Sequence, residues 1–573
     1  MSCLAAALGL AGGAAAWVLV RLIALLTNLA LFHRMGWELP SFTELHPGPW
    51  LPLVAMAGAL AVSLLALWAP VIRGHGIPET MEAVLVRQSR ISPRAALAKP
   101  LSAALAIGTG GPFGAEGPII VTGGALGSLL GQVLHVSPSE RKILLACGAA
   151  AGMSATFGAP LASVVLAIEL LLFEFSTRAF VPLVVASSVA AGMHSALFGA
   201  GPLFAVPAHD YAGLRHLPWF VVLGLVCGLL AVVVSRGLFL IEEGFRRLPV
   251  KDFWHPVIGA ALFSLVGFAV PRALGVGYDA IGDVLNDRLA VGAIAALAIA
   301  KLIAWWIALG SGTSGGTLAP LLLIGGAFGS LVGSLAAALM PGLGLSPGAF
   351  AVVGMAATFG ASTRATFTSI VFLFELTGDY KIILPLMLAA VVADLVAAGL
   401  MHESLMTEKL ARRGLRVDTE LAVDALRTTP VREVMSPEVE TLPAETTCGE
   451  ARRGFEAGRH SAYPLVDQEG RCAGMVSRGD LLESRGDDGR PVLEVASRDL
   501  VTVGPDDSVF VALRRIVEEG VEHLPVLADG RLVGICTRTD VLRARHRQLD
   551  LEVRQPGWRG IGMPRQGSSS GQR

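Results

Sequence analysis

A single carboxylate opens a long apolar run in the segment Gly114-Ala115-Glu116-Gly117-Pro118. The proline suits the first turn of a helix, where its missing N–H loses no hydrogen bond. A helix start offers an anion free N–H groups and the positive end of the helix dipole. An ionisable side chain at bilayer depth is costly, which makes it a functional candidate. Glu116 is therefore predicted to occupy the place of a passing anion and to leave when protonated, as a gate does. The alternative is a carboxylate that only caps its own helix.

Two further segments have the same character. Residues 74–78 read GHGIP and residues 316–320 read GTLAP, each with glycine before an apolar run and a proline at its start. Leu318 stands where the first segment has Glu116, so this helix start would present free amides without a carboxylate. Three such starts predict an anion held by backbone N–H groups, because a cation would need carbonyl and carboxylate oxygens instead.

An internal repeat connects two of these segments. The sequence GTGGPFGAEGPIIVTGGALGSLLG begins at Gly108 and GSGTSGGTLAPLLLIGGAFGSLVG begins at Gly310, an offset of 202 residues. The same offset matches residues 152–159 to residues 354–361. A constant offset over separate blocks predicts two related membrane halves, about 1–200 and 210–410, whose discontinuous helices meet near the midplane. The alternative is that glycine-rich membrane helices look alike because small residues pack well.

Composition divides the chain. It has 573 residues, 53% hydrophobic and 16% charged, but the apolar character stops near Met401. We therefore expect a membrane domain over 1–410, a linker over 411–429, a soluble module over 430–546 and a disordered tail over 547–573. The first apolar run, about 4–31, fits a tilted membrane helix better than a signal peptide. The net charge of −1 and the scattered cysteines suggest no nucleic-acid partner, disulfide framework or metal site.

The soluble module also repeats. A strand–helix–strand rhythm runs over about 430–485 and again over about 490–546, and the copies end alike at Ser477 to Asp480 and at Thr537 to Asp540. This pattern predicts two small α+β units. The predicted fold class is an all-α polytopic membrane protein, with two inverted-topology repeats and broken helices, followed by an α+β module.

The segments GHGIP, GAEGP and GTLAP, in this order, resemble the signature segments of the CLC family of chloride channels and chloride/proton exchangers, over about residues 4–410. The C-terminal pair is similar to tandem CBS domains. The resemblance implies a homodimer in a lipid bilayer that moves chloride or similar small anions, with Glu116 as the external gate. It implies a transporter rather than an enzyme, without a required cofactor. The implied anion contacts are His75, Gly76, Gly117, Pro118, Thr317, Leu318, Ala319 and Met406.

Three positions depart from the family pattern. His75 replaces a serine, either as an N–H donor that gains charge as pH falls or as a neutral ring that fills the place. Met406 replaces a tyrosine and cannot donate a hydrogen bond from its side chain. Leu170 replaces an internal glutamate that carries protons, which favours a channel-like or weakly proton-coupled protein. The alternative is a chloride/proton antiporter with another internal route. Glu169 is adjacent, but neighbouring residues on a helix point about 100° apart.

The resemblance also assigns candidate residues in the CBS pair. Ser477, Asp480, Thr537 and Asp540 lie where family members commonly hold an adenine nucleotide, and the alternative is a purely structural dimerisation role. Lys409, Arg412, Arg413 and Arg416 follow the last apolar run, which predicts a cytosolic C-terminal part in a protein of the cell membrane.

Two other functions remain open from sequence, a CBS-regulated cation transporter and a membrane sensor without transport. A magnesium transporter would call for clustered membrane carboxylates, whereas those of this chain are dispersed. The broken helices argue against a simple anchor. For three of the embedded charged residues, Arg364, Glu375 and Asp394, buried pairing is favoured over a role in the pathway.

Overall fold

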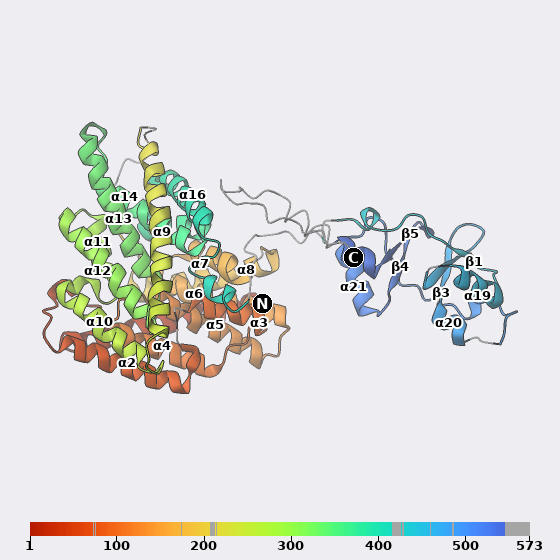
Figure 1. Ribbon diagram of the computed structural model, residues 1–573, viewed down its shortest axis with the longest axis horizontal. Coiled ribbons are helices and arrows are strands. Elements are labelled where there is room, and N and C mark those ends of the chain that lie inside the picture. Colours follow the sequence, from red (N-terminus) through yellow and green to blue (C-terminus); the bar gives the residue numbers. More distant parts are fainter. Residues whose placement is uncertain are drawn as a thin grey trace. The chain divides into compact units, whose positions relative to one another are not determined.

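The computed structural model describes residues 1–72, 74, 76–173, 175–206, 213, 215–414, 426, 429–458, 460–483 and 486–544. The chain forms two compact units, Met1–Leu421 and Ala422–Arg573, which are coloured red to cyan and cyan to blue (Figure 1). Predictions for His75, for Arg416, for most of the linker over 411–429 and for the tail lie outside the described residues.

The first unit is helical, and its two halves contain the same elements in the same order. The first half comprises α1 (Ser2–Leu31), α2 (Leu51–Trp68), α3 (Ile77–Val86), α4 (Pro93–Gly108), α5 (Glu116–Val133), α6 (Pro138–Phe157), α7 (Pro160–Ala167), which continues into a π-helical turn (Ile168–Leu172), and α8 (Thr177–Phe198). The second half comprises α9 (Leu217–Arg246), α10 (His255–Ala269), α11 (Tyr278–Leu285), α12 (Val291–Gly310), α13 (Leu318–Leu339), α14 (Pro347–Thr363), α15 (Thr366–Thr377) and α16 (Ile383–Leu400). The short α17 (Glu408–Ala411) follows.

Membrane character and chain breaks follow the local sequence. Among the described residues, seven helices are long and apolar enough to cross a membrane. The predicted interruptions are present, because α4 ends at Gly108 before α5 begins at Glu116, and α12 ends at Gly310 before α13 begins at Leu318. Glycine and proline interrupt the helices at both junctions. The irregular backbone that results is tolerated at bilayer depth where it is buried in protein.

Small residues bring the interrupted helices together. Helix α5 packs along α6, and α13 packs along α14 (Figure 1). A Cβ on Gly123 would lie 2.1 Å from the Gly148 carbonyl oxygen, and a Cβ on Gly325 would lie 2.7 Å from that of Gly354. Only glycine permits such close approach of two helix backbones, the packing that membrane helices favour. Both pairs fix α5 and α13, whose first turns carry the candidate site.

The second unit contains two α+β repeats. The first comprises β1 (Leu442–Pro443), α19 (Cys448–Ala457), β2 (Ala462–Val466), β3 (Cys472–Ser477) and α20 (Arg478–Glu483), with β1 parallel and β3 antiparallel to β2. The second comprises α21 (Val509–Glu518) and the antiparallel strands β4 (His523–Ala528) and β5 (Arg531–Thr537). Two small cores are buried: one joins the second repeat to the segment around Val431, and the other joins the first repeat to the segment around Val492. A helical membrane part followed by an α+β module confirms the predicted fold class.

Candidate functional site

The three glycine-proline segments meet inside the helical unit. Gly74 forms a bridge with Ser314, and Gly114 forms one with Gly316. The Gly114 N–H donates to the Gly316 carbonyl at 3.3 Å, and the Gly316 N–H donates back at 3.0 Å. A Cβ on Gly76 would lie 2.6 Å from the carbonyl oxygen of Gly117. The starts of α3, α5 and α13 therefore converge, although the two last are 202 residues apart in sequence.

The Glu116 carboxylate lies at this junction, in the first turn of α5. Its residue is 1% exposed. Oε1 accepts a hydrogen bond from the Tyr278 hydroxyl at 3.0 Å, and Oε2 has no hydrogen-bond partner among the described residues. A Cβ on Gly316 would lie only 2.8 Å from Oε2. The carboxylate thus lies over the segment that opens α13, where free amides and the positive end of a second helix dipole favour negative charge.

The three helix starts are not equivalent. The N–H of Gly76, which precedes α3, donates to Glu79 Oε2 at 2.7 Å, so that start holds a carboxylate from its own helix. Leu318 gives α13 no carboxylate. The Glu116 carboxylate of α5 therefore lies against the start of α13, which has no carboxylate of its own. A mobile anion could occupy the same place.

The predicted anion contacts of α5 and α13 are all buried at the junction. They are Gly117, Pro118, Thr317, Leu318 and Ala319. Gly76 is buried against Gly117. Met406 is 1% exposed within the apolar core of the unit, and its N–H donates to Ser404 Oγ at 3.2 Å.

Two buried lysines flank the junction, and sequence reasoning missed both. Lys99 Nζ donates to the carbonyls of Ile72 and Gly74, each at 2.8 Å. Lys301 Nζ donates to the carbonyl of Gly275 at 2.8 Å and attracts the Glu116 carboxylate electrostatically. The pair is separated by the repeat offset of 202 residues. The sequence signal that could have identified them is a single lysine at the corresponding position of two related apolar runs.

Leu170 and Glu169 lie in the π-helical turn after α7. Leu170 is buried. The Glu169 carboxylate accepts hydrogen bonds at the start of α15, from the N–H groups of Phe367 at 3.3 Å and Thr368 at 2.9 Å and from Thr368 Oγ1 at 2.5 Å. These contacts give Glu169 a helix-capping role and leave a leucine at the predicted proton position.

Glu375 mirrors this arrangement in the other half. Its carboxylate accepts from the N–H groups of Leu161 at 2.9 Å and Ala162 at 2.7 Å, at the start of α7. Arg364 forms an ion pair with Asp394 at 3.7 Å. The predicted pairing is present for Arg364 and Asp394, whereas Glu375 serves a helix contact through backbone N–H groups.

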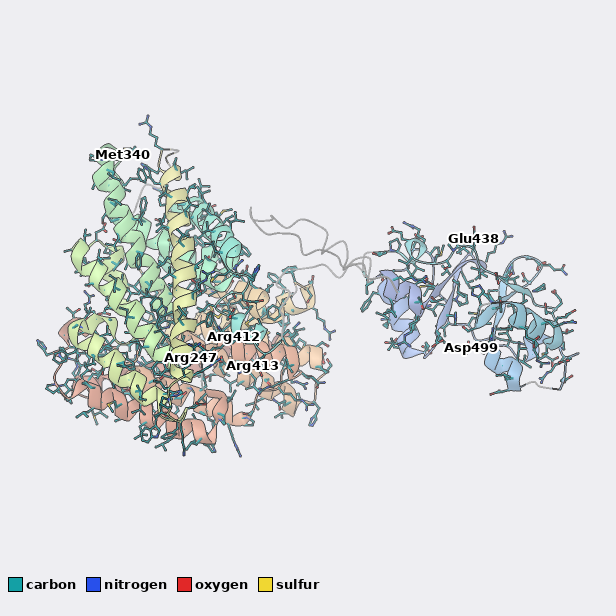
Figure 2. The ribbon with its side chains drawn as sticks, viewed as in Figure 1. Arg247, Met340, Arg412, Arg413, Glu438 and Asp499 are labelled. Atoms are coloured by element: carbon teal, nitrogen blue, oxygen red, sulfur yellow. The ribbon has the colours of Figure 1, made fainter. Side chains whose placement is uncertain are left out.

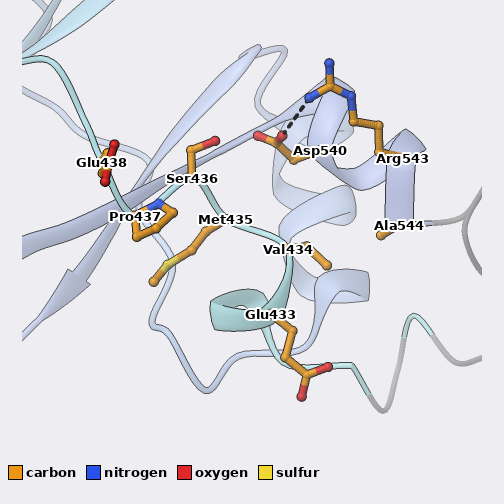
Figure 3. Close-up of a pocket in the computed structure, with 9 residues that line it drawn as sticks. All are labelled: Glu433, Val434, Met435, Ser436, Pro437, Glu438, Asp540, Arg543 and Ala544. Carbon is orange, nitrogen blue, oxygen red and sulfur yellow. Dashed lines mark ion pairs between the residues drawn. The ribbon is translucent and has the colours of Figure 1, made fainter.

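Two open clefts of the second unit include predicted nucleotide-binding residues in their lining. One, of about 410 Å³, lies beside β5 and is shown in Figure 3; it is lined by Glu433, Val434, Met435, Ser436, Pro437, Glu438, Asp540, Arg543 and Ala544. The other, of about 530 Å³, lies between the repeats, and its lining includes Ser477, Asp480 and His523. Thr537 lines neither cleft but contacts Asp540.

Both aspartates cap the helix that follows their strand. Asp480 Oδ2 accepts from the Ser477 N–H at 2.7 Å and hydroxyl at 2.8 Å, and Asp540 Oδ2 accepts from the Thr537 N–H at 3.0 Å and hydroxyl at 2.7 Å. The second oxygen of Asp540 forms an ion pair of 3.9 Å with Arg543 (Figure 3). One carboxylate oxygen is thus used by the fold, and the other remains at the cleft.

Comparison with known proteins gives a consistent result. The family described as "Voltage gated chloride channel" matches residues 57–398, and the CBS domain matches residues 431–487 and 492–547. The H(+)/Cl(−) exchange transporter ClcA of Vibrio campbellii is 31% identical over 389 residues, covering 64% of this chain and 82% of that protein. The chloride channel protein CLC-f of Arabidopsis thaliana is 28% identical over 603 residues, covering 90% of this chain and 76% of that protein.

A solved structure shows the same architecture. The crystal structure of a slow cyanobacterial Cl−/H+ antiporter superposes with a TM-score of 0.64 at 26% identity, covering 72% of this chain and 97% of that one. These findings confirm the resemblance seen in the three segments and in the CBS pair. Because the family match covers more than half of its length, the chain belongs to the voltage-gated chloride channel family, the CLC family, and carries two CBS domains in tandem.

Proposed function

We propose that this protein moves chloride or a similar small anion along a path gated by Glu116. Anion transport is the activity of the CLC family, which sets aside the cation-transporter and sensor alternatives. The gate assignment depends on one observation: the buried carboxylate lies at the start of a second helix, with one oxygen lacking a partner among the described residues. Chloride efflux from proteoliposomes carrying the Glu116→Ala variant tests it.

The transport mode is proposed to be channel-like or weakly coupled to protons. Leu170 has no group that titrates, and the carboxylate of Glu169 is engaged by three hydrogen bonds at a helix start. The second candidate is a chloride/proton antiporter with another internal route. Similarity to exchangers favours it, since ClcA of Vibrio campbellii and the cyanobacterial antiporter both bear that description.

The basic residues near helix ends support a proposed membrane sidedness. Arg246 ends α9, Arg247 and Lys251 follow it, and Lys409, Arg412 and Arg413 follow α16. The Arg412 guanidinium lies 5.1 Å from the ring of Phe239 in α9, and Figure 2 shows Arg247, Arg412 and Arg413 toward the opposite end of the unit from Met340. Basic ends favour the cytoplasmic side. We propose a cell-membrane protein with cytosolic CBS domains.

A homodimer with one pathway in each subunit is the proposed assembly, on the basis of family resemblance. Exposed apolar side chains such as Leu161 on α7 and Phe367 on α15 offer a surface for lipid or for a second copy. Light scattering in detergent distinguishes a dimer from a monomer.

Gly316→Ala is expected to lower chloride efflux about tenfold. The new Cβ would lie 2.5 Å from the Gly114 carbonyl oxygen, and overpacking of this kind costs about 1–3 kcal/mol and shifts backbone. Gly292→Ala on α12 is the matched control, because a Cβ there meets nothing within 4 Å. Efflux from Gly316→Ala equal to that of the control would mean that the contact between the two segments is not part of the path.

We further propose that the cleft at Asp540 binds an adenine nucleotide that modulates transport. Asp540 keeps one oxygen at the cleft for a ribose hydroxyl, and Arg543 brings a positive charge for phosphate. The lining of the other cleft includes Arg478, but its guanidinium donates to the carbonyls of Phe455 at 2.9 Å and Gly458 at 3.5 Å. Burial also lowers the pKa of the His523 imidazole in that cleft below its usual range. The Asp540 cleft is therefore the better candidate.

Asp540→Asn is expected to weaken nucleotide binding about tenfold, since a hydrogen bond to a charged group contributes about 1.5–3 kcal/mol. Isothermal titration of the purified protein with ATP, ADP and AMP measures it. Asp529→Asn, at an exposed turn between β4 and β5, is the control. Equal affinities in the variant and the control, or no binding by the wild-type protein, would leave the CBS pair with a structural role only.

A further inference from the structure

The gate carboxylate has a fixed partner that no sequence motif indicates. Tyr278, the first residue of α11, donates its hydroxyl to Glu116 Oε1 at 3.0 Å. It is the one side-chain donor to this carboxylate among the residues that the structure describes. The two residues lie 162 positions apart and belong to different halves of the repeat.

The ring of Tyr278 is held between two phenylalanines. Its centroid lies 6.4 Å from that of Phe157 at the end of α6 and 6.1 Å from that of Phe204, both in edge contact. Both phenylalanines are buried. Edge contacts of this geometry stabilise one ring orientation. The hydroxyl is therefore directed at Glu116 by its surroundings and not by the carboxylate alone.

The backbone that precedes Tyr278 is held as well. The Gly275 N–H donates to the Gly110 carbonyl at 3.3 Å, and the Gly275 carbonyl accepts from Lys301 Nζ at 2.8 Å. On the other side, Asp279 Oδ2 accepts from the Ser41 hydroxyl at 2.7 Å and pairs with Arg272 at 4.0 Å. None of these contacts involves Glu116, so the position of the Tyr278 backbone does not depend on the carboxylate.

We propose that Tyr278 is a positioning residue that latches the gate closed. The inference rests on the proposed role of Glu116. The Tyr278 hydroxyl donates to the Glu116 carboxylate and so stabilises the position in which Glu116 blocks the anion. Because Tyr278 is fixed and cannot move with the carboxylate, it does not stabilise the open position. The strength of this one hydrogen bond then sets the fraction of time for which the path is closed.

Tyr278→Phe removes a single oxygen and keeps the ring between its two neighbours. It is expected to raise chloride efflux from proteoliposomes about tenfold or more at neutral pH, the factor that loss of one hydrogen bond to a charged group provides. In the Glu116→Ala background the same substitution is expected to change nothing, because the carboxylate that it would release is absent. Tyr380→Phe, at a tyrosine that is 77% exposed, is the matched control.

Four proteins, the wild type, the two single variants and the double variant, distinguish the gate proposal from the latch proposal. Unchanged efflux from Glu116→Ala would contradict the gate itself. A raised efflux from Glu116→Ala with wild-type efflux from Tyr278→Phe would overturn the latch alone. A change from Tyr278→Phe that persists in the Glu116→Ala background would also overturn it, since the hydroxyl would then act on the anion path directly. Gel filtration of each variant verifies that the compared proteins are equally folded.

Discussion

Replacing Glu116 with alanine is expected to raise chloride efflux from proteoliposomes by about tenfold or more at neutral pH, equivalent to about 1.4 kcal/mol in the barrier. The carboxylate is buried over the segment that opens α13, and in the proposed gate it takes the place of the anion there. Alanine removes the competitor and leaves the helix starts in place. Glu116→Gln, which mimics the protonated acid, is expected to change efflux in the same direction.

Glu375→Ala is the matched control for this experiment. Its carboxylate also receives backbone N–H groups at a helix start, but at α7 and away from the junction. We expect lower thermal stability and no rise in efflux. If efflux from Glu116→Ala equals that of the wild type, or if both variants raise it equally, Glu116 is not a gate.

Acidification provides a second readout of the same group. Protonation removes the charge that holds Glu116 at the helix starts, so wild-type efflux is expected to rise as pH falls. The Glu116→Ala variant lacks the titrating group, and its efflux is expected to vary little over the same range. A wild-type profile as flat as that of the variant would contradict the proposal that protonation releases the gate.

The second large effect concerns protons. Under an imposed chloride gradient, the wild-type protein is expected to move chloride without proton uptake above that of empty liposomes. A buried leucine cannot carry a proton, and Leu170 occupies the predicted position. Paired chloride-electrode and pH-electrode recordings from one liposome preparation measure both fluxes.

Glu169→Gln tests the alternative route in the same assay. If the wild type shows no proton uptake, Glu169→Gln is expected to leave both fluxes unchanged and only to weaken the start of α15, where three hydrogen bonds are made. Stoichiometric proton uptake by the wild type would refute the uncoupled mode. Its loss in Glu169→Gln would then assign the proton route to Glu169 despite its capping role.

The two halves share a fold but differ in chemistry at corresponding places. Helix α5 begins with Glu116 and α13 with Leu318, so one helix start brings an acid and the other brings open amides. The capping glutamates Glu169 and Glu375 are mirrored, and so are the lysines Lys99 and Lys301. The scaffold is thus symmetric where it supports helix ends and asymmetric at the proposed gate.

Much of this protein was determined by local sequence. Runs of apolar residues, interrupted by glycine and proline at the junctions after Gly108 and Gly310, predicted broken membrane helices, because backbone preferences act over a few residues. The constant offset predicted that two of these breaks are related, and the composition change near Met401 predicted a soluble module. These features need no knowledge of which residues touch.

The contacts at the site were decided by tertiary structure. Nothing near Tyr278 in sequence indicates that its hydroxyl reaches Glu116, and Lys301 is an isolated charge until packing brings it to the same junction. In sequence, Glu169 is only the neighbour of the predicted proton position, whereas the fold places its carboxylate at the start of α15. The physical reason is that a hydrogen bond between residues 162 or 199 positions apart depends on how whole helices pack, which no local preference specifies.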